Sequence, residues 1–397
     1  MSVASSQPSL AKAIGRWTLA GLIVNSVVGA GIFGLPSSIA KQVGDYAPWA
    51  YVLGAVMTMV TTAVVVELSS QFEKPGGAYL YVREAFGPMV GIQTGWFSWL
   101  ARVTTAAAIA NLLMSYLAGF WPMLSSTGAR SLGVLLIVGG LAAVNVRGVK
   151  HGTAISNVFT AVKLLPLIVL VILGALHWGD PVSSATQTAM PDWKAWTDAL
   201  VAMVFAYSGF ESAMIPGSEL KNPRRDNPIA AFTALLVVST LYVCLHLVVM
   251  RAVPGMAASE RPLSDAAAIC MGETGRTVIA IAAIVSTFGW LSAAVVTAPR
   301  LTYAMAEQGD FPAVCGRVHG AYRTTWVSIL LWAGLVIALA SYGNFIWNVV
   351  LSVAARLVVY STMCAAAIRL RLAHPARDAW RAPFGIAIPV LGIGICC

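Results

Sequence analysis

Long apolar runs constrain this chain more than any other feature of its sequence. Ten stretches dominated by apolar side chains are bounded by charged residues, Pro and Gly, and an eleventh begins near residue 383. About 20 apolar residues in a helix are enough to span a bilayer. The chain is 58% hydrophobic and only 10% charged, whereas about a quarter of the residues of a soluble domain are charged. We therefore predict an all-α polytopic membrane protein embedded in a lipid bilayer. The predicted spans lie at about 18–41, 47–70, 89–118, 131–147, 153–177, 196–219, 229–251, 275–306, 325–341 and 344–371.

The distribution of Lys and Arg predicts the orientation. These residues collect in alternate connecting segments, beginning with the N-terminal segment 1–17, and basic loops face the cytoplasm. We expect a multi-pass protein of the inner (plasma) membrane with a cytoplasmic N-terminus and an uncleaved first span. The longest loops are expected at 178–195 and 252–274. A pI near 9.4 suggests nucleic acid in a soluble protein, but loop charge explains it here, so we expect no nucleic-acid partner.

Patterns typical of enzymes and metal sites are missing from the sequence. The six cysteines show no metal-ligand spacing, the five histidines are isolated, and no phosphate-binding loop is present. We expect no catalytic residues, no metal and no cofactor. A membrane enzyme or a receptor is the alternative from another functional class.

Two apolar spans contain residues that interrupt helices. The first span reads NSVVGAGIFGLP over residues 25–36, and the sixth reads FAYSGFESAMIPG over 205–217. Glycine destabilises a helix by about 1 kcal/mol relative to alanine. A single cluster of this kind is equally typical of close helix packing. Two clusters five spans apart instead indicate a transport site at the membrane midplane.

The spacing of the two interruptions predicts an inverted repeat. Spans 1–5 (18–177) and spans 6–10 (196–371) have similar lengths, and because five is odd the second half is inverted relative to the first. A break in span 1 exposes amides and the positive end of a helix dipole near Gly31 to Phe33, which suits a carboxylate. A break in span 6 leaves unpaired carbonyls near Phe205 to Tyr207, which suit an ammonium group. Together they predict a receptor for an α-amino acid or a close relative.

Three basic residues lie well inside predicted spans, Arg102 in span 3, Lys163 in span 5 and Arg356 in span 10, and Glu211 is the matching acid deep in span 6. A charge at the bilayer centre costs roughly 2.5–3.5 kcal/mol, so such residues usually face a cavity or a partner. An internal salt bridge that only fixes helix packing is the alternative for Arg356. An Arg102–Glu211 pair is a competing possibility.

Six segments in order carry a family resemblance: VNSVVGAGIFGLPSSIA, PGGAYLYVREAFGP, AVNVRGVKHG, AVKLLPL, GFESAMIPGSELKNPRRDNPIA and APRLTYAMAEQGDFP. From about residue 15 to 372 the chain resembles the amino acid–polyamine–organocation permeases, of the bacterial amino acid permease type. The resemblance implies a leucine-transporter-type fold with five-plus-five inverted repeats, broken helices 1 and 6, and usually twelve spans. This chain stops in its eleventh span (383–397), so an inactive truncated permease is one alternative. The last two spans often serve dimer contacts in the family, so a homodimer is also expected.

The resemblance also implies substrate-binding positions. On span 1, Ser26, Val27, Gly29, Ala30 and Gly31 match the segment that binds the substrate carboxylate, and on span 6, Phe205, Ala206, Ser208 and Gly209 match the segment that binds the amine. Phe205 stands where antiporter-like relatives have a tryptophan lid, and Trp290 matches a gating aromatic on span 8. The remaining matches to pocket positions are Ala101, Arg102 and Thr105 on span 3 and Ser352 on span 10.

Arg102 indicates which charge the substrate can carry, and Lys163 indicates which ion is coupled to transport. A cation facing the pocket repels a cationic side chain, which favours a neutral or acidic amino acid unless Glu211 neutralises it. Some family members resemble this chain in having a span-5 lysine where sodium-driven relatives bind a cation. Because burial disfavours a charged ammonium group, such a lysine can load and release a proton. We therefore expect proton-coupled uptake through Lys163 and Glu211. Sodium coupling, or an amino acid/amine antiporter of arginine/agmatine or polyamine type, is the alternative.

Overall fold

Helices form the regular structure of the protein in the computed structural model, which describes residues 15–72, 77–148, 153–176, 189–213, 222–373 and 380–397. Within those ranges the chain contains no β-strand, which confirms the all-α class. The helices are α1 (Arg16–Val27), α2 (Ala30–Gly34), α3 (Pro36–Val43), α4 (Ala47–Gln71), α5 (Gly77–Phe86), α6 (Pro88–Leu117), α7 (Thr127–Val146), α8 (Thr153–Leu176), α9 (Trp193–Ala206), α10 (Phe210–Ala213), α11 (Pro223–Ala252), α12 (Pro262–Glu307), α13 (Trp326–Tyr342), α14 (Phe345–Ala373) and α15 (Ala387–Cys396).

Local sequence explains where several helices begin. Pro36, Pro88 and Pro262 lie in the first turns of α3, α6 and α12, where the missing amide hydrogen has no intrahelical partner to lose. Asp192 precedes α9 and its carboxylate accepts a hydrogen bond from the amide of Ala195 at 2.8 Å. Such a cap satisfies one of the free amides of the first turn.

The helices coincide in position with the predicted spans. Seven helical stretches in the described residues are long and apolar enough to cross a membrane. Three further apolar helical stretches are shorter. They are the part Val162–Leu176 of α8, the helix α13 (Trp326–Tyr342) and the helix α15 (Ala387–Cys396). Each predicted span overlaps one of the helices α1 to α15, and the count of ten complete spans stays a prediction.

The expected loop at 252–274 is partly wrong. Helix α12 already begins at Pro262 and is interrupted at Gly272, where φ is +70° and ψ is −171°. Because this backbone conformation suits glycine and breaks the helix, residues 262–271 form a separate short helical segment before the long membrane helix. This segment of ten residues is too short to span a bilayer, so a search for membrane spans passes over it.

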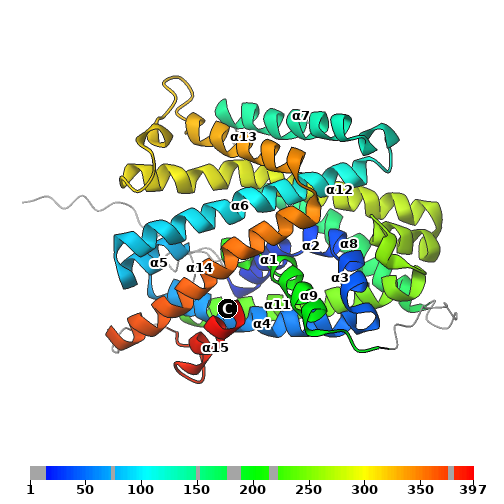
Figure 1. The fold of residues 1–397 in the computed structure, drawn as a ribbon, viewed down its shortest axis with the longest axis horizontal. Helices are drawn as coiled ribbons and strands as arrows, with labels where there is room; N and C mark the ends of the chain where they lie inside the picture. The colour runs from blue at the N-terminus through cyan, green and yellow to red at the C-terminus, as the bar shows by residue number, and fades with distance from the viewer. Residues whose placement is uncertain (1–14, 73–76, 149–152, 177–188, 214–221, 374–379) are drawn as a thin grey trace, which may run out of the picture.

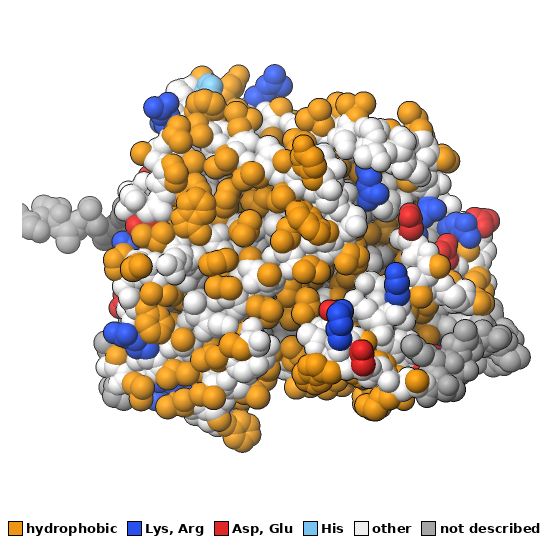
Figure 2. Space-filling view, viewed as in Figure 1, with side chains coloured by type: hydrophobic (Ala, Val, Ile, Leu, Met, Phe, Trp, Pro, Cys, Tyr) orange, Lys and Arg blue, Asp and Glu red, His pale blue; other side chains and the backbone are white. Residues whose placement is uncertain are grey.

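The longest helices run in roughly the same direction, with α7 and α13 side by side at one edge (Figure 1). In the interior, α6 packs against α12 and α14, and α11 packs against α1 and α4. Hydrophobic side chains cover the middle of the face shown in Figure 2, and most charged side chains lie towards its two ends. Apolar residues such as Leu136 and Leu165 are 65% and 67% exposed. Exposure of this kind is expected where the surrounding solvent is lipid.

Candidate functional site

The first span is broken at Val28 and Gly29, as the glycine cluster predicts. Both residues leave the helical conformation, with ψ of 104° at Val28 and φ of −165° at Gly29. Helical hydrogen bonding then continues from Gly31 through Leu35 into α3. The amide of Gly29 donates to the phenol oxygen of Tyr242. In the described part of the chain, the amides of Ala30 and Gly31 meet no hydrogen-bond acceptor. These amides can therefore bind an anion.

Side chains from two other helices bind the carbonyl oxygens at the end of α1. Lys163 on α8 is only 7% exposed, and its Nζ donates to the carbonyl oxygens of Asn25 at 2.5 Å and Val28 at 2.7 Å. The phenol of Tyr242 on α11 donates to the carbonyl oxygen of Val27 at 3.0 Å. The structure thus places Lys163 at the break in span 1.

The sixth span is broken at Tyr207 to Gly209, between α9 and α10. Gly209 has φ of +112°, a conformation that only glycine adopts readily. The expectation of unpaired carbonyls here is wrong for two of the three. Phe205 accepts hydrogen bonds from the amide and the hydroxyl of Ser208, and Ala206 accepts one from Tyr242 at 3.3 Å. Ser208 at the break and Tyr242 from α11 thus supply the donors for these oxygens.

The two breaks cross at very short range. A Cβ atom added to Gly31 would lie 2.6 Å from the Cα of Ala206, and one added to Gly209 would lie 2.6 Å from the carbonyl oxygen of Ser26. Neither position has room for a side chain. The substrate-binding positions predicted on spans 1 and 6 are therefore brought into contact by the backbone itself.

A hydrogen-bonded series connects the sixth span to α6 and α14. Glu211 accepts from the amide of Gly209 at 3.0 Å and forms an ion pair with Arg356. Arg356 donates to Thr105 at 3.2 Å. The hydroxyls of Thr105 and Ser352 lie 2.6 Å apart, and Ser352 donates to the carbonyl oxygen of Ala101 at 3.2 Å. Three of the predicted pocket positions, Ala101, Thr105 and Ser352, therefore form one polar cluster with Glu211 and Arg356.

The Arg102–Glu211 ion pair, named above as a competing possibility, does not form. Glu211 pairs with Arg356 instead: its Oε1 accepts from the α14 guanidinium group, while its Oε2 accepts from the amide of Gly209. Arg102 is partly exposed and lies close enough to both residues to interact with them electrostatically. Trp290 is partly buried on α12 and packs against the hydrophobic core. No hydrogen bond joins Trp290 to the polar cluster within the described residues.

Two residues at this site were not predicted from the sequence. Tyr242 binds carbonyls of both broken helices at once, and Phe345 packs its ring edge-on against Phe205, with ring centroids 6.1 Å apart. The Phe345 ring would also lie 2.5 Å from a Cβ atom at Gly34, so the aromatic pair covers one end of the crossing. A lone tyrosine or phenylalanine in an apolar span carries no local signal of such a role.

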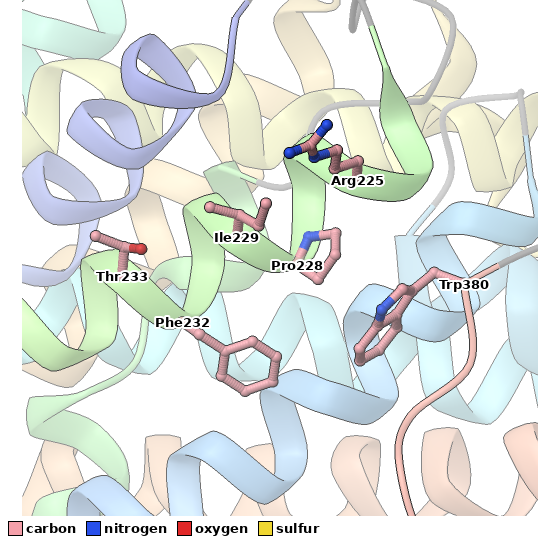
Figure 3. A pocket seen from close by; sticks show the side chains of 6 residues that line it. All are labelled: Arg225, Pro228, Ile229, Phe232, Thr233 and Trp380. Atoms are coloured by element: carbon pink, nitrogen blue, oxygen red, sulfur yellow. The ribbon is translucent and has the colours of Figure 1, made fainter.

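A hollow on the protein lies away from this site. It has a volume of about 580 Å³ and is lined by Arg225, Pro228, Ile229, Phe232, Thr233 and Trp380. Phe232 and Trp380 face one another across it (Figure 3), with ring centroids 6.3 Å apart. None of the predicted site residues lines this hollow. Within the described residues, no group of three or more His, Cys, Asp or Glu side chains is placed to hold a metal ion.

Comparison of the sequence with known proteins shows the family of the chain. A family model described as amino acid permease matches residues 14–397. The chain belongs to the amino acid permease family. It is 27% identical to the serine/threonine exchanger SteT of Bacillus subtilis, over 84% of this chain and 78% of that protein.

Two further relatives are named for substrates other than serine and threonine. The chain is 29% identical to the large neutral amino acids transporter small subunit 2 of Rattus norvegicus, over 82% of this chain and 64% of that protein. It is 26% identical to the methylthioribose transporter of Bacillus subtilis, over the whole of this chain and 89% of that protein. The family and these relatives are transporters, so the protein is an integral membrane transporter rather than an enzyme.

Proposed function

We propose that this protein is a secondary transporter that carries an α-amino acid across the inner (plasma) membrane by alternating access. The observation that carries the proposal is the crossing of the two broken helices at Gly31–Ala206 and Gly209–Ser26. Two helix breaks that meet inside a membrane protein offer unpaired backbone groups to a small polar ligand.

The substrate's two charged groups fit the two breaks. We assign its carboxylate to the free amides of Ala30 and Gly31, next to Ser26, Val27 and Gly29. We assign its ammonium group to the break in span 6, formed by Phe205, Ala206, Ser208 and Gly209. A carbonyl oxygen has two lone pairs, so the oxygen of Ala206, which accepts only from Tyr242, can still accept from the ligand, whereas Ser208 already occupies both lone pairs of the Phe205 oxygen.

Further predicted positions complete the pocket in this proposal. Ala101, Arg102, Thr105 and Ser352 border the side chain of the substrate, and Trp290 acts as a gate on α12. The proposal includes the five-plus-five inverted repeat, with halves at 18–177 and 196–371. It also includes a cytoplasmic N-terminal segment at 1–17 and a further helix in 383–397. A homodimer is the assembly that we expect.

The contact of Lys163 with the break favours coupling to protons. An ammonium group that binds the Asn25 and Val28 carbonyls holds the break in one arrangement, and loss of its proton removes the charge that those oxygens stabilise. Glu211, which binds the other break, is the second residue that we assign to coupling. Antiport is the second candidate, favoured by the likeness to a serine/threonine exchanger, and sodium coupling is the third.

Transport by the purified protein in liposomes tests the proposal. A thermal-shift panel of amino acids and amines first finds ligands, because a ligand that binds the folded state raises Tm. Uptake of the radiolabelled ligand is then compared with and without an inward proton gradient, and with unlabelled ligand inside. Gradient-driven uptake indicates symport, and uptake only against internal ligand indicates antiport. A folded protein that binds and transports none of the amino acids overturns the proposal.

A further inference from the structure

Two arginines and one glutamate lie together beside the break between α9 and α10. Arg102 comes from α6, Arg356 from α14 and Glu211 from α10. Glu211 and Arg356 form an ion pair, and Arg102 interacts electrostatically with both. Charged groups inside a membrane protein are costly unless other charges balance them. The net charge of these three side chains therefore influences which ligand can bind beside them.

Glu211 already has a partner for each carboxylate oxygen. Its Oε1 accepts from Arg356, and its Oε2 accepts from the Gly209 amide at 3.0 Å. Arg102 forms no ion pair and no hydrogen bond with any described residue. Glu211 thus compensates one arginine by direct contact and leaves the other available.

Arg356 also has an unused donor. A guanidinium group carries five N–H donors, and Arg356 uses Nη1 for Glu211 and Nη2 for Thr105. Its Nε makes no close hydrogen bond to a described residue, although Arg356 is only 9% exposed and the phenol of Tyr360 lies near its guanidinium group. A buried donor without an acceptor is unfavourable, so an acceptor from a ligand would stabilise it.

The two arginines are placed to act on one ligand group. Arg102 lies three residues before Thr105 on α6, a spacing that puts both on one face of the helix. Thr105 in turn contacts Arg356 on α14. The two guanidinium groups therefore approach the same place from neighbouring helices, at the predicted side-chain end of the pocket.

The charge balance distinguishes between classes of amino acid. With two arginines and one glutamate ionised, the group carries one net positive charge. A zwitterion with a neutral side chain leaves that charge in place, and a cationic side chain adds to it. A side chain with a carboxylate cancels it, and in the low dielectric of the interior this difference is large.

We propose that Arg102 and Arg356 bind the side-chain carboxylate of an acidic amino acid, so that the transporter selects aspartate- or glutamate-like substrates over their neutral amides. Arg102 contributes the uncompensated charge, and Arg356 contributes its Nε donor. This inference rests on the proposed amino acid transport and adds the substrate class to it.

Uptake of L-glutamate and L-glutamine by the full chain in liposomes tests the inference, since the two molecules have the same shape and differ in charge. The wild-type protein is expected to prefer glutamate by about tenfold or more, as charge-assisted hydrogen bonds are roughly twice as strong as neutral ones. Arg102→Gln lowers the glutamate-to-glutamine ratio by about tenfold, and Arg102→Lys keeps part of the preference. Arg276→Gln, at an exposed arginine paired with Glu273, is the control and keeps the wild-type ratio.

The outcomes separate this inference from the function on which it rests. Wild-type protein that takes up glutamine as well as glutamate overturns the inference and leaves amino acid transport intact. An unchanged ratio in Arg102→Gln also overturns it. Uptake of neither compound, nor of any other amino acid, counts against the proposed function itself. If Arg102→Gln does not fold, unlabelled aspartate, asparagine and lysine are tested as competitors of glutamate uptake by the wild-type protein. Competition by aspartate alone supports the inference, and equal competition by asparagine or lysine overturns it.

Discussion

The ammonium group of Lys163 on α8 lies 2.7 Å from the carbonyl oxygen of Val28, at the break in the first span. The end of a helix carries partial negative charge on its unpaired carbonyls, and Lys163 provides a positive charge there. Span 5 thus contacts the element that we propose binds the substrate carboxylate. A change in the charge of this lysine would act directly on that element.

Replacing Lys163 with methionine is expected to remove the response of uptake to a proton gradient. The methionine side chain keeps the length of lysine but cannot take up a proton or donate to the Asn25 and Val28 carbonyls. Uptake of labelled amino acid is measured in liposomes with and without an inward proton gradient. Lys194→Met, at an exposed lysine paired with Asp198, is the control and keeps the wild-type response. Gradient dependence retained in Lys163→Met would show that another group couples the proton.

Tyr242→Phe is expected to weaken the contact between the two breaks. Only the phenol oxygen is lost, and with it the hydrogen bonds to the carbonyl oxygens of Val27 and Ala206. We expect the free energy of unfolding to fall by about 1 kcal/mol, measured as a lower Tm of the detergent-solubilised protein. Tyr51→Phe is a matched control, because the Tyr51 phenol is buried beside Tyr242 but has no hydrogen-bond partner among the described residues. Equal Tm values for the two variants would contradict the role of Tyr242.

The sequence predicted the positions of the helix breaks but not the partners of the charged residues. Gly29, Gly31 and Gly209 act through local backbone geometry, and this geometry can be inferred from residue type alone. The partner of Glu211 could not be inferred, because Arg102 and Arg356 lie on different spans and the choice between them depends on how those spans pack. The same holds for the Phe205 and Ala206 carbonyls, since their donors are Ser208 and a tyrosine from another helix.

Glu67→Gln is expected to destabilise strongly the end of the bundle where α4 and α14 meet. Glu67 is fully buried on α4 and forms an ion pair with Arg371 of α14, while its Oε2 also accepts from the amide of Ala382 at 2.9 Å. Removing one partner of a buried ion pair leaves the other charge uncompensated, at a cost of about 3–5 kcal/mol. We expect a clear loss of Tm and of folded protein on size-exclusion chromatography. Asp198→Asn, in the exposed Lys194–Asp198 pair, serves as the comparison and changes Tm little; a Glu67→Gln protein as stable as Asp198→Asn would refute the expectation.

Gly209→Ala is expected to separate the crossed helices. A methyl group at residue 209 would lie 2.6 Å from the carbonyl oxygen of Ser26, and alanine would have to adopt φ of +112°. A backbone of this kind costs about 1–3 kcal/mol for a residue other than glycine, and the steric clash adds to it, so we expect loss of amino acid uptake together with a lower Tm. Gly139→Ala is the matched control, because α7 has open space within 4 Å of that position and alanine favours a helix. If Gly209→Ala transports at the wild-type rate, close contact between the two breaks is not needed for function, and the substrate must bind elsewhere.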